Sequence, residues 1–274
     1  MEAFLGPSDD SAVGSETTAG FDTPQCTYLE LRTTPRQTHS LTRETYLRAV
    51  LSEISRYPAE KLNLIVSLDR KMGLEALEDC LGVIERLVVG DRVGVGNRIV
   101  GIDICGDPCA GEVSDFQPFL EKAKKLGLGI TVHIAEVCTS LSYSGKYVYL
   151  RIIILQTTKN TSEENLDLLS YVPDRLGHAT FLDETALSIV LERKTPIELC
   201  LSSNLLCAFR LALMYGFPHA HRLDRCKTVT NLETHHIHQY LRSNHPIAVC
   251  VRPLPPTSFF SSANHPPSSQ RTDG

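Results

Sequence analysis

Short apolar runs alternate with amphipathic stretches along most of the chain between residues 26 and 251. The apolar runs have the length and the Val, Ile and Leu content of strands. They lie at Cys26–Arg32, Leu62–Leu68, Ile99–Ile104, Gly129–Ile134, Arg175–His178, Pro196–Leu201 and Ile247–Val251. The amphipathic stretches have helical spacing, at Thr42–Ile54, Leu74–Leu87, Phe116–Leu126, Leu166–Tyr171, Glu184–Arg193 and Thr230–Arg242. Thr42 is a suitable N-cap and Gly127 a suitable C-cap for two of these helices.

Strands that alternate with helices at this spacing predict βα units and a parallel sheet. We therefore predict an α/β fold of the (β/α)8 TIM-barrel type. Six or seven strands are recognisable, whereas a closed barrel of this type has eight. The barrel is thus expected to be incomplete by one or two strands.

The regular alternation is lost at both termini and in two internal segments. Residues 1–25 contain few large apolar residues and residues 252–274 are rich in Pro and Ser, so both are expected to be disordered. The apolar content of segments 137–161 and 205–225 has no matching partner face. We interpret both as insertions into a single domain that spans residues 26–251.

The composition is that of a soluble globular protein, with 42% hydrophobic and 22% charged residues. A net charge of −5 argues against a nucleic-acid binder, because such proteins carry a basic excess. No apolar run is long enough to predict a membrane span, and the acidic start lacks the features of a secretory signal. Nine cysteines without a CxxC pair are typical of reduced thiols. We expect a cytoplasmic protein that acts as a monomer.

Polar residues follow the predicted strands at their carboxyl ends, where the active sites of parallel α/β folds lie. His133 is a candidate metal ligand near the end of its strand, and Glu136 just beyond it is a candidate proton shuttle. His178 ends the next strand. We therefore expect residues 127–136 and 176–178 to be neighbouring parallel strands with both imidazoles at one rim. Each histidine could instead be a packed core side chain.

Other polar groups are expected at the same rim. The turn Thr33-Thr34-Pro35-Arg36 offers hydroxyls, backbone amides and a guanidinium to a phosphate, although it could also be a solvated turn. Glu198 adds a carboxylate, which could simply be an ion-pair partner. Six later histidines have spacings that resemble a metal tract, but the surrounding sequence does not alternate well, which favours structural roles for them. They are His219, His221, His235, His236, His238 and His245.

Several common motifs are absent from the sequence. An HxE motif with a later PCxxC is missing, which excludes the cytidine-type zinc deaminases. Neither a GxGxxG after a strand nor a GxxxxGK[ST] occurs, so the common nucleotide-cofactor motifs are excluded as well.

Taken in order, several segments resemble motifs of the adenosine/AMP deaminase family of zinc hydrolases, in particular its adenosine-deaminase-like branch, which acts on N6-methyl-AMP. The segments are Tyr28–Arg36, Val66–Arg70, Gly101–Pro108, Val132–Glu136, Pro173–His178 and Glu198–Asn204. Their order and spacing make the resemblance specific. It covers residues 26–251 apart from the two interruptions.

The resemblance implies a zinc-dependent hydrolase that converts N6-methyl-AMP into IMP and methylamine, with one Zn²⁺ per chain. His133 would be a zinc ligand. Glu136 would protonate a purine ring nitrogen, and His178 would orient or deprotonate the zinc-bound water, whose pKa the metal lowers. Gly106 would approach the purine through its backbone. The residues that would hold the nucleotide are Asp69, Thr33, Thr34, Pro35 and Arg36, with Arg36 facing the phosphate.

The sequence departs from the family pattern at the metal ligands. The family carries an HxH pair on its first strand, and nothing before Tyr28 matches it. His219-Ala-His221 has this spacing but not this place. The family's Asp-Asp pair after the last strand is replaced by Arg252-Pro-Leu-Pro. The first strand and the end of the last strand region are therefore expected to be missing from the barrel.

The departures leave alternatives to an active deaminase. One is a catalytically inactive isoform that retains partial nucleotide binding, because a zinc centre needs three or four ligands and only His133 remains. Another is an amidohydrolase that acts on a different cyclic amidine, which the phosphate-compatible turn at Thr33–Arg36 disfavours.

Overall fold

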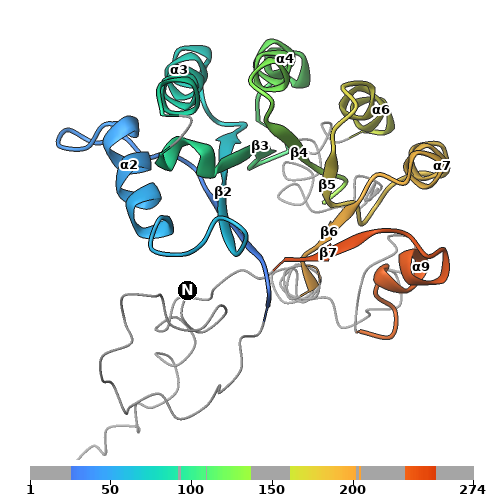
Figure 1. Ribbon diagram of the computed structural model, residues 1–274. Coiled ribbons are helices and arrows are strands. Elements are labelled where there is room, and N and C mark those ends of the chain that lie inside the picture. Colours follow the sequence, from blue (N-terminus) through green and yellow to red (C-terminus); the bar gives the residue numbers. More distant parts are fainter. Residues whose placement is uncertain are drawn as a thin grey trace, which may run out of the picture.

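The computed structural model describes residues 26–91, 94–108, 110–136, 161–201, 204 and 232–250. Parallel strands form one seven-stranded sheet in chain order. They are β1 Leu29–Thr33, β2 Leu62–Asp69, β3 Ile99–Cys105, β4 Gly129–Ile134, β5 Arg175–His178, β6 Ile197–Leu199 and β7 Ile247–Val249. The helices are α2 Arg43–Ile54, α3 Leu74–Gly90, α4 Gln117–Lys125, α6 Ser162–Ser170, α7 Glu184–Arg193 and α9 Ile237–Arg242, with 3₁₀ turns η2 Val95–Arg98 and η3 Val113–Phe116. Figure 1 shows the helices in an arc outside the strands.

The sheet is strongly curled. Arg32 on β1 lies 2.7 Å from Glu198 on β6, and Arg175 on β5 lies 2.6 Å from Glu30 on β1. In a flat sheet with about 4.8 Å between strands, β1 and β6 would be about 24 Å apart. Among the described residues no strand pairs β7 with β1. The predicted incomplete barrel of the TIM type is therefore confirmed.

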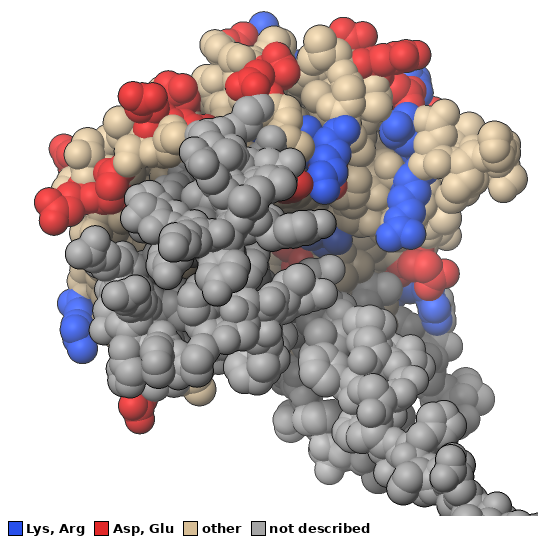
Figure 2. Space-filling view, turned by 180° about the vertical axis from the view of Figure 1, so that it is seen from behind, with Lys and Arg blue, Asp and Glu red and all other residues tan. Residues whose placement is uncertain are grey.

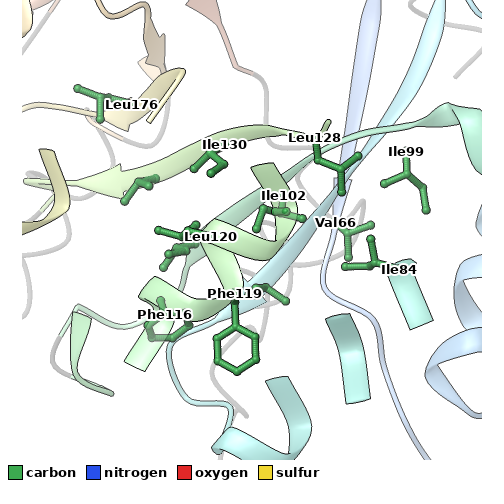
Figure 3. Packing of buried hydrophobic residues seen from close by; sticks show 14 of the residues in the cluster. Val66, Ile84, Ile99, Ile102, Phe116, Phe119, Leu120, Leu128, Ile130 and Leu176 are labelled. Atoms are coloured by element: carbon green, nitrogen blue, oxygen red, sulfur yellow. The ribbon is translucent and has the colours of Figure 1, made fainter. Parts of the chain in front are cut away.

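Alternating rows of side chains separate the apolar layer from a polar interior. Val66, Ile102 and Ile130 are register partners on β2, β3 and β4, and they belong to the buried apolar cluster together with residues of α3 and α4 (Figure 3). The next row along the same strands, which includes Asp103 and Thr131, points the other way, because side chains alternate along a strand. The curl encloses this second row.

Most predicted elements appear within a few residues of their expected ends. Thr42 caps α2 as predicted, because its hydroxyl accepts a hydrogen bond from the Thr45 amide, and Gly127 adopts φ 78° after α4. Helix α6 begins at Ser162, earlier than the predicted Leu166, because Thr161 caps it by accepting a hydrogen bond from the Glu164 amide.

The largest differences lie at the carboxyl-terminal end of the domain. Helix α9 begins at Ile237 rather than Thr230, and strands β6 and β7 are shorter than predicted. Of the predicted insertions at 137–161 and 205–225, only Thr161 is among the described residues. The ends predicted to be disordered, residues 1–25 and 252–274, lie outside the described residues. No described helix combines the length and apolar character needed to cross a bilayer.

Candidate active site at the carboxyl rim

The structure places His133 and His178 side by side. Strands β4 and β5 pair in parallel, with His133 opposite Gly177 and Ile134 opposite His178. The two imidazole centroids are 5.2 Å apart. The predicted adjacency of these strands, with both rings at one rim, is confirmed. A Cβ atom on Gly177 would lie 3.2 Å from the ring of His133, a tight contact that the glycine avoids.

A buried carboxylate holds the ring of His133. Nδ1 of His133 lies 2.9 Å from Oδ1 of Asp103, and Ser67 donates a hydrogen bond of 3.2 Å to Oδ2. Burial alone raises the pKa of Asp103, but the charges of His133 and Arg32 and the bonds from His133 and Ser67 outweigh it, so its pKa is lowered. Burial likewise acts to lower the pKa of His133, yet Asp103 reverses this and raises it. His133 is thus oriented through Nδ1, and Nε2 is left for other contacts.

Sharp backbone turns at the ends of β4 and β5 position Glu136 and His178. Ala135 has φ 49°, His178 has φ 62° and Ala179 has φ 46°. Left-handed conformations are costly for residues with a Cβ and collect at functional sites. After these turns, Nε2 of His178 lies 3.4 Å from Oε1 of Glu136. The two predicted catalytic residues are therefore brought together.

His178 is neutral at physiological pH. Burial, reinforced by the neighbouring His133 and His236, lowers the pKa of His178 to about 3. Its Nδ1 atom is buried and has no hydrogen-bond partner among the residues described. An imidazole with so low a pKa is a weak base, so this environment favours orienting a water molecule over deprotonating one.

A network of ion pairs, here called the charge ladder, lies in the interior of the curled sheet and includes Arg32, Glu198, Arg175 and Asp103. Both Glu198 carboxylate oxygens accept from Nη2 of Arg32, at 2.8 and 2.7 Å. Thr131 donates to Glu198 at 3.3 Å, and Nε of Arg175 lies 3.3 Å from the same oxygen. Nη1 of Arg32 also lies 3.6 Å from Asp103. The ion-pair interpretation of Glu198 is confirmed, and Arg32 links this ladder to the carboxylate that holds His133.

The predicted substrate-binding residues occupy the same edge, beyond β1, β2 and β3. Oδ1 of Asp69 accepts from the amide of Lys71 at 2.8 Å. Gly106 has φ 100°, and a Cβ there would lie 2.4 Å from Oδ1 of Asp69. Asp69 and Gly106 are thus in contact, and this close approach requires glycine.

The turn that follows β1 has one fixed part and one exposed part. The Thr33 hydroxyl lies 2.7 Å from the Tyr46 hydroxyl, the Thr34 side chain bonds to Cys105, and Pro35 is buried. Arg36 is exposed. The guanidinium predicted to bind a phosphate is therefore presented to solvent by an anchored turn.

The described donors do not fit a zinc centre. A structural or catalytic zinc site needs three or four ligands. Within the described ranges, no group of three or more His, Cys, Asp or Glu side chains is placed to hold a metal ion. The Nδ1 atom of His133 contacts Asp103, so of its two ring nitrogens only Nε2 could bind a metal ion.

The carboxyl-terminal histidines have structural contacts where they are described. Nε2 of His236 lies 2.9 Å from the carbonyl oxygen of His178, and Nε2 of His245 lies 2.7 Å from that of Thr195. His235 accepts from the amide of Ile237, and His238 contacts a backbone carbonyl. His219 and His221 lie outside the described residues. The structural roles that the sequence favours for this group hold for its described members.

Asp103 and Arg32 contribute to the rim, although neither was among the candidates drawn from the sequence. The available signal for Asp103 was a single carboxylate inside the otherwise apolar run Ile99–Cys105. Arg32 lies inside a predicted strand, where a long cation is expected only if it is paired. His236 was a candidate only as part of the histidine group, and its contact with the carbonyl of His178 joins residues far apart in the chain.

Acidic and basic side chains both occur over the described part of the face shown in Figure 2.

Comparison with known proteins finds sequence similarity to adenosine deaminase-like proteins. No family model matches the chain. It is 31% identical over 242 residues to an adenosine deaminase-like protein of Caenorhabditis elegans, covering 86% of this chain and 51% of that protein. It is 28% identical over 236 residues to mouse N6-methyl-AMP deaminase, covering 82% and 53%. The chain is thus similar in sequence to adenosine deaminase-like proteins over most of its own length. The resemblance inferred from its motifs is confirmed.

Solved structures of adenosine deaminase-like proteins share the fold. The Arabidopsis N6-mAMP deaminase superposes with a TM-score of 0.60 at 25% identity, covering 83% of this chain and 57% of that one. Arabidopsis ADAL complexed with GMP gives a TM-score of 0.59 at 25% identity, covering 83% and 56%. The chain spans about half the length of the curated adenosine deaminase-like relatives it matches.

Proposed function

We propose that this chain binds a purine nucleoside monophosphate at the carboxyl rim and that the reaction of this rim is hydrolytic deamination, in which N6-methyl-AMP and water give IMP and methylamine. One observation carries the proposal. His133, Glu136 and His178 converge at one rim in a chain whose relatives are named N6-methyl-AMP deaminases. Homologous structures were solved with GMP and with IMP, which supports a purine nucleotide as ligand.

The residues divide the work between the two ends of the nucleotide. Arg36, exposed beyond β1, takes the phosphate, because a guanidinium offers paired donors to phosphate oxygens. Gly106 has no side chain and lets the purine approach the backbone beside Asp69. Glu136 donates a proton to a ring nitrogen, which makes C6 more electrophilic. Neutral His178 orients the attacking water.

A second candidate is a nucleotide-binding protein without turnover. It is favoured by the donor set, since no group of three or more His, Cys, Asp or Glu side chains among the described residues is placed to hold a metal ion. Deamination of this kind uses a metal-activated water. Turnover by this chain therefore requires metal ligands from outside its described residues.

Assay, binding and metal analysis together separate the two candidates. Purified protein is assayed with N6-methyl-AMP with and without added Zn²⁺, its zinc content is measured by elemental analysis, and IMP binding is measured by calorimetry. Glu136→Gln should abolish turnover. Glu192→Gln is the matched control, because Glu192 is exposed near the end of α7, which leads into the amino end of β6.

The outcomes are distinct. Turnover lost only in Glu136→Gln supports the deaminase, and IMP binding without turnover or zinc supports the second candidate. Absence of both turnover and nucleotide binding in a folded preparation rejects both.

A further inference from the structure

Two cysteines at the rim lie side by side on neighbouring strands. Strands β6 and β7 are parallel, with Leu199 opposite Val249, and the amide of Cys250 donates to the carbonyl of Leu199 at 2.8 Å. Cys200 and Cys250 directly follow these register partners, one residue beyond the end of each strand. Each thiol shifts the pKa of the other.

The backbone geometry suits a bond between the two sulfurs. Neighbouring strands are about 4.8 Å apart, and disulfides form when the Cα atoms are about 4.4–6.8 Å apart with side chains on the same side. Register partners on adjacent parallel strands point to the same face of the sheet. The hydrogen bond from the Cys250 amide to the Leu199 carbonyl continues the pairing of the two strands up to these cysteines.

We propose that Cys200 and Cys250 are a redox-active dithiol that a small-molecule disulfide such as oxidised glutathione converts into an internal disulfide between β6 and β7. The Cys250 thiolate attacks one sulfur of oxidised glutathione, forming a mixed disulfide and releasing one glutathione thiolate. The Cys200 sulfur, after losing its proton, displaces the second glutathione. The protein loses two electrons and two protons, and one oxidised glutathione becomes two reduced molecules.

The local chemistry assigns the two roles within the pair. The pKa of Cys250 is lowered, first because Cys200 donates a hydrogen bond to it, with Arg32 and His133 adding favourable charge against the opposing effect of burial. The same hydrogen bond and burial raise the pKa of Cys200. Cys250 is therefore the attacking sulfur and Cys200 the resolving one.

The other described cysteines provide contrast. Burial raises the pKa of Cys80 and of Cys105 to about 12, so both stay protonated. Cys200 and Cys250 are each partly exposed, which allows a small disulfide to reach them. The pair joins β6 to β7, a three-residue strand that pairs only with β6 among the described strands. Oxidation would fasten this edge strand and remove both thiols from the rim.

A glutathione redox titration of the full chain tests the proposal. The protein is equilibrated at graded ratios of reduced to oxidised glutathione, quenched in acid, alkylated, digested with trypsin and analysed by mass spectrometry. Cys200 lies in the tryptic peptide 195–210 with Cys207, and Cys250 lies in peptide 243–271, so fragmentation identifies which sulfur is linked. We expect a Cys200–Cys250 link that forms in the native chain at a ratio about tenfold more reducing than in the urea-unfolded chain.

Variants assign the roles. Cys200→Ser should stop at a mixed disulfide of Cys250 with glutathione, Cys250→Ser should abolish the link, and Cys26→Ser should leave it unchanged. The redox titration of the wild-type chain tests the Cys200–Cys250 link even if a variant does not fold. No link in the native chain, a link through Cys207, or equal formation in native and unfolded protein would overturn the proposal.

Discussion

Nδ1 of His133 lies 2.9 Å from Oδ1 of Asp103, a carboxylate with no exposed surface. This contact fixes the ring of the principal rim histidine. It also requires that the carboxylate be compensated from several sides, because an uncompensated charge cannot remain buried. Arg32 and Ser67 supply the remaining compensation, so the orientation of one ring depends on residues of β1, β2, β3 and β4.

Asp103→Asn is expected to lower the pKa of His133, because Asp103 is the group that raises it. The change also leaves Arg32 with less compensation, so we expect a loss of about 3–5 kcal/mol in the free energy of unfolding, the range for broken buried pairs. NMR titration of the His133 ring and urea unfolding measure the two effects. Asp79→Asn is the control. Asp79 forms an ion pair with Arg43, but its side chain is about half exposed, so the pair should contribute less than about 1 kcal/mol to the free energy of unfolding. An unchanged His133 pKa would contradict the assignment.

Gly106→Ala is expected to cost about 1–3 kcal/mol of stability, because φ 100° is unfavourable for alanine and its Cβ would meet the Asp69 carboxylate. Gly73→Ala is the matched control. Gly73 has φ −70° and nothing within 4 Å of an added Cβ, and as the N-cap of α3 it should lose less than about 1 kcal/mol on replacement by alanine. Chemical denaturation compares the two variants. Equal stability would show that the close approach of Gly106 to Asp69 is not required.

Stability should fall as the pH is lowered from about 7 towards 4. Burial lowers the pKa of His236 to about 4, below the value near 6.5 expected in the unfolded chain. Between these values the unfolded state binds more protons, so stability rises with pH through this window and is lost as the pH falls. We expect His236 to contribute about 1–2 kcal/mol of this change between pH 7 and pH 5.

Urea unfolding across this pH range measures the effect. His236→Gln should reduce the slope without removing it, because His178, with a pKa of about 3, contributes in the same window. His39→Gln, at an exposed position, should leave the profile as in the wild type. A wild-type profile without a slope in this window would contradict the neutral, buried state of His236.

If the rim binds a nucleotide, AMP should bind more tightly than adenosine. A hydrogen bond to a charged group contributes roughly 1.5–3 kcal/mol, which corresponds to at least about tenfold in affinity for a phosphate held by Arg36. Arg36→Ala should remove the difference in calorimetry. Arg56→Ala is the control, because Arg56 follows α2 at the opposite edge of the sheet. Equal affinities for AMP and adenosine in the wild-type chain would remove the Thr33–Arg36 turn from the site.

The sequence by itself determined the order and type of the elements and the edge at which the site lies. Apolar periodicity marked the buried faces, and local cap chemistry at Thr42 and Gly127 marked helix ends, because both act over a few residues. The parallel βα pattern then placed His133, Glu136 and His178 at one rim without any knowledge of distances. Element ends were missed where a cap was not recognised, as at Thr161 before α6.

Only the tertiary structure decided what compensates the charges at that rim. The pairing of Arg32 with Glu198 joins residues 166 positions apart, and it exists because the curl of the sheet brings β1 to β6 across the interior. The same is true of Asp103 with His133 and of His236 with His178. Whether a buried ionisable group is a ligand, a base or a structural partner depends on its desolvation and on nearby charges, and these are properties of three-dimensional neighbours that no local pattern encodes.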